Sequence, residues 1–92
     1  IGGNNMKSIR IEYCISWGYV DRAVALTANL LNEHKNNIGE ITIIPSSGGV
    51  FELVVNDKLL FSKKELGRFP ENGEAEKLTR EALWITHHLH FI

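Results

Sequence analysis

Polar and apolar residues alternate along residues 7–13, and this period of two predicts a half-buried strand. From Gly18 onward, apolar residues recur at intervals of three and four, as they do on one face of a helix. The asparagines and the glycine within residues 35–39 should end that helix. The apolar stripe expected along the helix comprises Val20, Ala23, Val24, Thr27, Leu30, Leu31 and His34.

β-Branched side chains dominate residues 40–44, which predicts a second strand that ends at a proline. The serines and glycines of residues 46–49 predict a turn. Residues 50–55 and 58–62 are also strand-like, and only an Asn-Asp dipeptide separates them. Because a two-residue linker of this kind suits a tight turn, the two segments should form a hairpin.

A second helix is expected after the irregular stretch of residues 67–74, whose acidic side chains suit the positive end of a helix dipole. The apolar face expected on this helix comprises Ala75, Leu78, Ala82, Ile85 and Leu89. The whole order is β-α-β-β-β-α, with the first two strands parallel because a helix connects them. This order predicts an α/β fold of the thioredoxin-like type, a four-stranded mixed sheet with the helices packed on it.

The length of 92 residues suits one domain, which we expect to span residues 6–86. Residues 1–5 precede Met6 and are expected to be the remnant of an added leader, and residues 87–92 a C-terminal tail. Hydrophobic content of 43% and a net charge of -1 indicate a globular domain with no basic surface for nucleic acid. The single cysteine excludes a disulfide-stapled secreted scaffold, so a cytoplasmic protein is expected. No apolar run is long enough for a membrane span.

Cys14 is the one cysteine of the sequence, so it has no partner for an intramolecular disulfide. It stands between the first strand and the first helix, where free backbone N–H groups and the positive helix end stabilise a thiolate. We therefore expect Cys14 in a loop, with its sulfur near the amides of residues 16–18. The alternative is a small buried apolar side chain without reactivity.

Two segments of the sequence resemble the Rdx family, the group of selenoproteins W, T and H and their relatives. The family carries Tyr-Cys-x-x-Cys, or selenocysteine in place of the second Cys, after its first strand, and selenoprotein W continues with Gly-Tyr. Tyr13, Cys14, Gly18 and Tyr19 match that motif. The second segment matches through Gly49, Phe51, Glu52, Ser62, Lys63, Lys64, Gly67, Arg68, Phe69 and Pro70.

Trp17 stands where the family has its second Cys or selenocysteine. A dithiol cycle needs one chalcogen to attack and another to leave, so one chain of this sequence cannot complete it. One account of Trp17 is a recoded selenocysteine, because the UGA and UGG codons differ by one base. A second account is natural loss, and a third is a large residue that caps the first helical turn.

The resemblance implies thiol- or selenol-based redox work with glutathione or a protein thiol as partner, and neither a cofactor nor a metal. Cys14 would be the nucleophile or the resolving thiol. The basic cluster of Lys63, Lys64 and Arg68 could attract carboxylates of glutathione, or could equally be a solvated sheet edge. The alternative function is a non-enzymatic interaction module that docks a protein on Cys14, Trp17 and Phe69. His87 and His90 are three apart but form only a weak metal motif.

Overall fold

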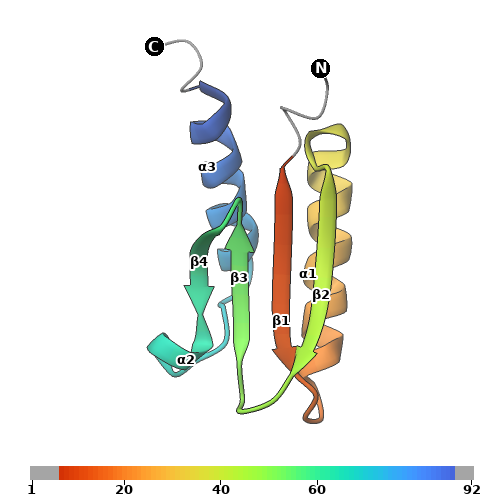
Figure 1. The fold of residues 1–92 in the computed structure, drawn as a ribbon, viewed down its shortest axis with the longest axis vertical. Helices are drawn as coiled ribbons and strands as arrows, with labels where there is room; N and C mark the ends of the chain where they lie inside the picture. Colours follow the sequence, from red (N-terminus) through yellow and green to blue (C-terminus); the bar gives the residue numbers. More distant parts are fainter. Residues whose placement is uncertain (1–6, 89–92) are drawn as a thin grey trace.

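The computed structural model describes residues 7–88 and the side chains of residues 7–84. The expected leader and the last four residues therefore lie outside the described part. Within residues 7–88, four strands form one mixed sheet, as the sequence predicted, and their order in the sheet is β2-β1-β3-β4 (Figure 1). The strands are β1 (Ser8–Cys14), β2 (Glu40–Ser46), β3 (Phe51–Val55) and β4 (Lys58–Ser62).

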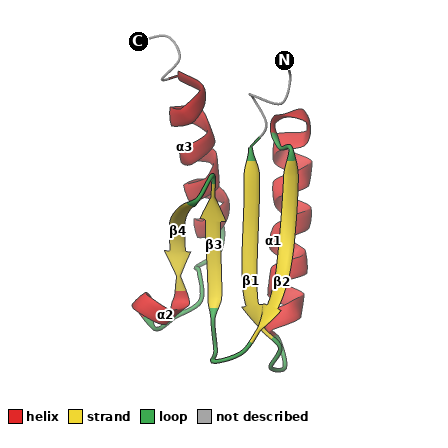
Figure 2. Cartoon of the chain, in the orientation of Figure 1, coloured by secondary structure: helices red, strands yellow, loops and turns green. Residues whose placement is uncertain are grey.

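Three α-helices complete the domain: α1 (Tyr19–His34), α2 (Lys63–Leu66) and α3 (Glu74–His88). A 3-10 turn, η2 (Lys35–Asn37), follows α1 directly. Figure 2 shows the two long helices on one side of the sheet and the short α2 beside the end of β4. The sequence did not predict α2, because four residues are too few to establish a helical period. Helix α3 also runs two residues into the segment expected to be a tail.

β1 is parallel to β2, as the helical connection between them requires. β1 is antiparallel to β3, because the short loop between β2 and β3 reverses the chain, and the hairpin makes β3 and β4 antiparallel. Asn56 and Asp57 form the predicted two-residue turn between β3 and β4, with φ of 50° and 68°. Two consecutive positive φ values are those of a type I′ turn, whose twist matches that of the flanking strands. The Asn56 side chain also accepts a hydrogen bond from the Ser8 amide at 3.0 Å.

Pro45 lies inside β2, one residue before its end, rather than terminating it as predicted. β2 is an edge strand, and the carbonyl of Ser46 faces β1, where it accepts from the Ile15 amide. Backbone groups alternate along a strand, so Pro45 faces the open edge, where its missing N–H breaks no ladder hydrogen bond.

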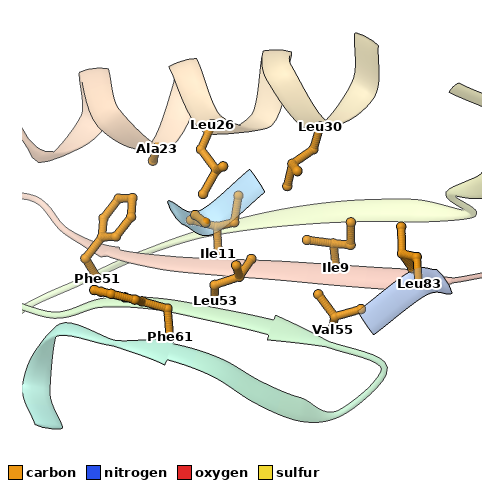
Figure 3. Packing of buried hydrophobic residues seen from close by; sticks show 11 residues of the cluster. Ile9, Ile11, Ala23, Leu26, Leu30, Phe51, Leu53, Val55, Phe61 and Leu83 are labelled. Carbon is orange, nitrogen blue, oxygen red and sulfur yellow. The ribbon is translucent and has the colours of Figure 1, made fainter. Parts of the chain in front are cut away.

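The core lies between the sheet and the two long helices (Figure 3). Its sheet side is formed by alternate residues of β1, β3 and β4, namely Ile9, Ile11, Phe51, Leu53, Val55 and Phe61. Its helix side consists of Ala23, Leu26 and Leu30 from α1, and Ala75 and Leu83 from α3.

The expected stripe on α1 is only half correct. Ala23 and Leu30 are buried as predicted, whereas Leu26, which was not predicted, takes the central position. Val24 is 54% exposed, on a flank of the helix that does not contact the sheet. The apolar face of α1 is wider than the part of the sheet that it can cover. The sheet covers the half of this face that lies next to α3.

The stripe on α3 differs from expectation in a similar way. Ala75 is buried as predicted, and Leu78 and Ala82 are half-buried against the core. Thr79 is fully buried although it is polar. Its hydroxyl donates to the carbonyl of Ala75 at 2.9 Å, which removes the cost of burying the oxygen.

Helix α2 is held by a polar contact between β3 and β4. The Ser62 hydroxyl donates to Oε1 of Glu52 at 2.5 Å and accepts from the Glu65 amide at 3.1 Å, as an N-cap does. Oε2 of Glu52 accepts from the amides of Phe51 and Lys64. These bonds fix the start of α2, and therefore the backbone of Lys63.

Ser62→Ala should lower the free energy of unfolding by about 1–3 kcal/mol, because a helix cap and a hydrogen bond of a buried hydroxyl are lost together. Urea denaturation followed by circular dichroism measures this difference. Ser47→Ala, at an exposed loop position, is the matched control and should leave stability within about 0.5 kcal/mol. Equal stability of the two variants would contradict the structural role of the Ser62–Glu52 contact.

Candidate functional site

Cys14 is the last residue of β1, and both neighbouring segments hold the chain there. Its amide donates to the Val50 carbonyl at 2.9 Å, and the Ile15 amide donates to the Ser46 carbonyl at 2.9 Å. The expectation that Cys14 lies in the loop was therefore wrong by one residue. The loop between β1 and α1 comprises residues 15–18, and the thiol stands at its entrance.

The sulfur of Cys14 is buried and lies beside a hydroxyl group. Sγ lies 3.1 Å from Oγ of Ser16, and the residue is 4% exposed. The pKa of the thiol is lowered, first by the Ser16 hydroxyl, then by the backbone amides of Ser16 and Gly49, and finally by the charge of Lys63. Burial acts in the opposite direction and is outweighed. The structure thus gives Cys14 the environment of a thiolate.

The amides near the sulfur differ in part from those expected. Ser16 belongs to the expected range of residues 16–18, but Gly49 comes from the loop between β2 and β3. Gly49 has a φ of 72°, which favours glycine. A Cβ there would lie 3.6 Å from Oη of Tyr19 and 4.0 Å from Nζ of Lys63. Tyr19 and Lys63 therefore flank the same peptide that contacts the sulfur.

Trp17 is 98% exposed and lies at the outer surface of the loop. The N-cap of α1 is Gly18, with a φ of 91°, and no side chain caps the helix there. The account of Trp17 as a packed or capping residue is therefore wrong. Ile15, in the same loop, is 71% exposed. Two large apolar side chains next to the buried thiol are therefore exposed to solvent.

An aromatic and cationic cluster, here called the Phe69 cluster, adjoins the thiol. The ring centroid of Phe69 lies 4.8 Å from that of Tyr19 and 5.6 Å from that of Phe51. Two cations lie over the Phe69 ring, with Cζ of Arg22 at 4.1 Å and Nζ of Lys63 at 5.3 Å from its centroid. Phe69 is consequently half-buried, so of the two aromatic side chains considered for docking a protein, Trp17 is the exposed one.

The predicted basic cluster does not act as one unit. Lys63 faces the Tyr19 and Phe69 rings, whereas Arg68 forms a two-pronged ion pair with Glu74 at 2.7 and 3.0 Å. That pair lowers the pKa of the Glu74 carboxyl to about 2. Lys64 is exposed, and its amide donates to Glu52. Only Lys63 therefore contributes charge to the thiol.

Sequence reasoning missed the Ser16 side chain and Arg22 as members of the site, and it gave Gly49 only as part of the family motif, with no role at the thiol. Arg22 could have been found, because it follows Tyr19 by three residues and neighbours it on the helix surface. Ser16 lies between the two motif positions and has a side chain that can donate to sulfur. Nothing in the local sequence around Gly49 signals contact with Cys14, since that contact depends on how the strands pair.

No metal site of three or more His, Cys, Asp or Glu residues occurs within the described part of the chain. The His87 side chain and His90 lie outside the described residues, so the predicted weak His motif has no structural account. A hollow between α1 and the start of α3 is lined by Arg22, Leu26 and Glu76, among others, but Cys14 does not line it. No helix between residues 7 and 88 is long and apolar enough to cross a membrane.

Comparisons with known proteins agree on one relationship. The model of the Rdx family matches residues 8–81. A crystal structure of a selenoprotein W-related protein from Vibrio cholerae is similar with a TM-score of 0.78 and 28% identity, covering 86% of this chain and 99% of the other. A crystal structure of a protein from Bordetella parapertussis is similar with a TM-score of 0.77 and 28% identity, covering 84% and 98%. The comparison with curated proteins gives no match.

Ser16→Ala should raise the pKa of Cys14 toward that of an ordinary thiol, because it removes the largest cause of the lowering. The rate of alkylation by iodoacetamide, measured against pH, reports that pKa as its midpoint. The wild-type midpoint should lie below about 8.5, the value of a free cysteine. Ser47→Ala is the control and should keep the wild-type profile. A wild-type midpoint at or above the free-thiol value would show that the loop does not activate Cys14.

Proposed function

The chain belongs to the Rdx family, and we propose on that basis that it is a thiol redox protein whose reactive atom is Sγ of Cys14. Family membership indicates a redox-type role. The surroundings of Cys14 are the observation that supports assigning this role to Cys14. The coverage of residues 8–81 includes every residue that contacts the sulfur.

The donors around Cys14 support the proposal through hydrogen-bond chemistry. A neutral thiol is a weak acceptor, whereas a thiolate is a charged one. The Ser16 hydroxyl and the amides of Ser16 and Gly49 are therefore better satisfied when the sulfur is ionised. Since the thiolate is the nucleophile in exchange reactions, this environment favours attack on a disulfide near neutral pH.

The proposed reaction is thiol–disulfide exchange through a mixed disulfide. The Cys14 thiolate attacks one sulfur of a partner disulfide, a new bond to Sγ forms, and the other sulfur leaves as a thiolate. An incoming thiol, from glutathione or a protein, then attacks the mixed disulfide and restores Cys14. Trp17 cannot perform that second step, because indole has no chalcogen. The reducing cytoplasm is the compartment that fits such a partner.

Trp17 bears on whether the cycle is complete in the native protein. Its exposure agrees with a position that served a partner rather than the core. We favour a recoded selenocysteine over natural loss, because the residues on both sides follow the selenoprotein W pattern. The gene decides between them: an in-frame UGA at codon 17 supports the selenocysteine account, and UGG supports a native tryptophan.

The alternative function is a protein-interaction module on the same scaffold. The observation that favours it is the pair of exposed side chains, Ile15 and Trp17, beside the thiol. Aromatic anchors contribute strongly to protein interfaces. Under this alternative, Trp17→Ala would abolish partner binding, whereas Cys14→Ser would leave it unchanged.

Trp17→Cys should fold normally and form a disulfide with Cys14. A Cys-x-x-Cys spacing at the start of a helix brings the Cα atoms within the disulfide range of roughly 4.4–6.8 Å. Loss of the exposed indole should change stability by less than about 0.5 kcal/mol. The measurement is a titration against glutathione redox buffers, with thermal melts of both redox forms.

Trp17→Ser is the matched control, since it removes the indole without adding a thiol. It should melt like the wild type and show no dithiol–disulfide transition. A Trp17→Cys variant that folds but forms no disulfide under mild oxidation would contradict the account of position 17 as an erased chalcogen site. A large loss of stability in both variants would contradict the assignment of Trp17 as free of packing.

A further inference from the structure

Two cations of the Phe69 cluster have no acidic partner within residues 7–84. The ion pairs of this region join Arg68 to Glu74 and Arg80 to Glu33, and neither Lys63 nor Arg22 takes part in one. Both cations lie over aromatic rings instead. A ring face attracts a cation without neutralising its charge, so both side chains keep a full charge for a ligand.

Lys63 lies beside Gly49 in the β2–β3 loop, and its charge acts on the Cys14 thiol. Its Nζ lies 4.0 Å from the point where a Cβ on Gly49 would stand, and the Gly49 amide is among the groups that lower the pKa of the Cys14 thiol. The carbonyl of the next residue, Val50, accepts a hydrogen bond from the Cys14 amide at 2.9 Å. The ammonium group and the sulfur therefore flank one peptide unit. A molecule that presents a sulfur to Cys14 brings its neighbouring atoms within reach of Lys63.

The position of Lys63 is fixed before any ligand arrives. It is the first residue of α2, whose start is held by Ser62 and Glu52. Its charged end lies 5.6 Å from the Tyr19 centroid and 5.3 Å from the Phe69 centroid. A lysine that is already ordered loses less conformational entropy on binding, which favours affinity for an anion.

We propose that Lys63, supported by Arg22, forms an anion-binding subsite that selects small disulfides with a carboxylate close to the reacting sulfur. This proposal rests on the proposed function of Cys14 and names its substrate class. The 4% exposure of Cys14 favours a small molecule over a bulky one. In the exchange, the Cys14 thiolate bonds to one sulfur of the disulfide, and the other sulfur departs as a thiolate with its own carboxylate.

Lys63 should contribute more than Arg22. The charge of Lys63 acts on the Cys14 sulfur. Arg22 lines the hollow between α1 and α3, which also contains Glu71 and Glu76. Their carboxylates reduce the attraction of an anion to that side of the guanidinium. Substitution of the two cations should therefore give graded effects.

The test compares three small disulfides that differ in charge: anionic 3,3′-dithiodipropionate, neutral 2-hydroxyethyl disulfide and cationic cystamine. Rate constants for mixed-disulfide formation with Cys14 are measured at low ionic strength by mass spectrometry. The ratio of the anionic to the cationic rate is independent of how much Cys14 is ionised, because the same thiolate attacks both reagents. This ratio isolates the subsite from any change in the thiol itself.

Lys63→Gln should lower the anionic-to-cationic ratio about tenfold, and Arg22→Gln about threefold, as expected for loss of one nearby charge. Lys63→Met keeps the apolar stem over the rings and should behave like Lys63→Gln. Lys58→Gln is the matched control: it removes the same charge at the β3–β4 turn, at the other end of the sheet, and should leave the ratio unchanged (Figure 1). In about 1 M salt the differences should largely disappear.

An unchanged ratio in Lys63→Gln and Lys63→Met, with Cys14 still reacting, would overturn the subsite and leave the proposed redox function intact. An equal fall in the Lys58→Gln control would also overturn it, because only the net charge would then matter. Failure of Cys14 to react with any of the three disulfides would overturn the redox function and the subsite together.

Discussion

The end of β1 is held from both sides, and the candidate site depends on this constraint. The amide of Cys14 bonds to the loop that precedes β3, and the amide of Ile15 bonds to the last residue of β2. These two bonds hold both ends of the β2–β3 loop against the end of β1, and Gly49 of this loop is among the groups that lower the pKa of the thiol. Without them the thiol would lose the contribution of Gly49 to its lowered pKa and would keep the contribution of Ser16, which is local in sequence.

The order of strands and helices was predictable because each longer element has a clear period in the sequence. Residues 7–13 alternate with a period of two, and the Asn-Asp turn fixes the hairpin register beside the turn, up to an irregularity between Leu53 and Val54. The buried face of α1 was less predictable. Val24 and Leu26 both belong to its broad apolar sector, and only the position of the sheet decides that Leu26 is buried. Polar Thr79 is buried through a bond to its own helix, which no apolar pattern can indicate.

The candidate site was predictable only where it is local in sequence. Cys14 was found from its place between a strand and a helix. The groups that activate it come from three segments, and the contribution of Gly49 and Lys63 exists only after β1, β3 and β4 have paired. The Ser62–Glu52 contact shows the same dependence, since it joins two strands and in doing so orders the first turn of α2. The charge of Lys63 therefore lies near the thiol only because the strands pair in this register.

The residue at position 17 can change the chemistry of the loop without changing the stability of the fold. The Trp17 side chain is almost fully exposed to solvent, so the identity of this residue has little effect on the stability of the folded state. The donors to the sulfur come from Ser16 and Gly49 and do not involve Trp17. A chalcogen could therefore stand at this position, or be lost from it, without altering the environment of Cys14. It follows that the surroundings of Cys14 are the same whether or not a second redox group is present. Under the proposed thiol–disulfide exchange, the residue at position 17 would determine how a mixed disulfide on Cys14 is resolved.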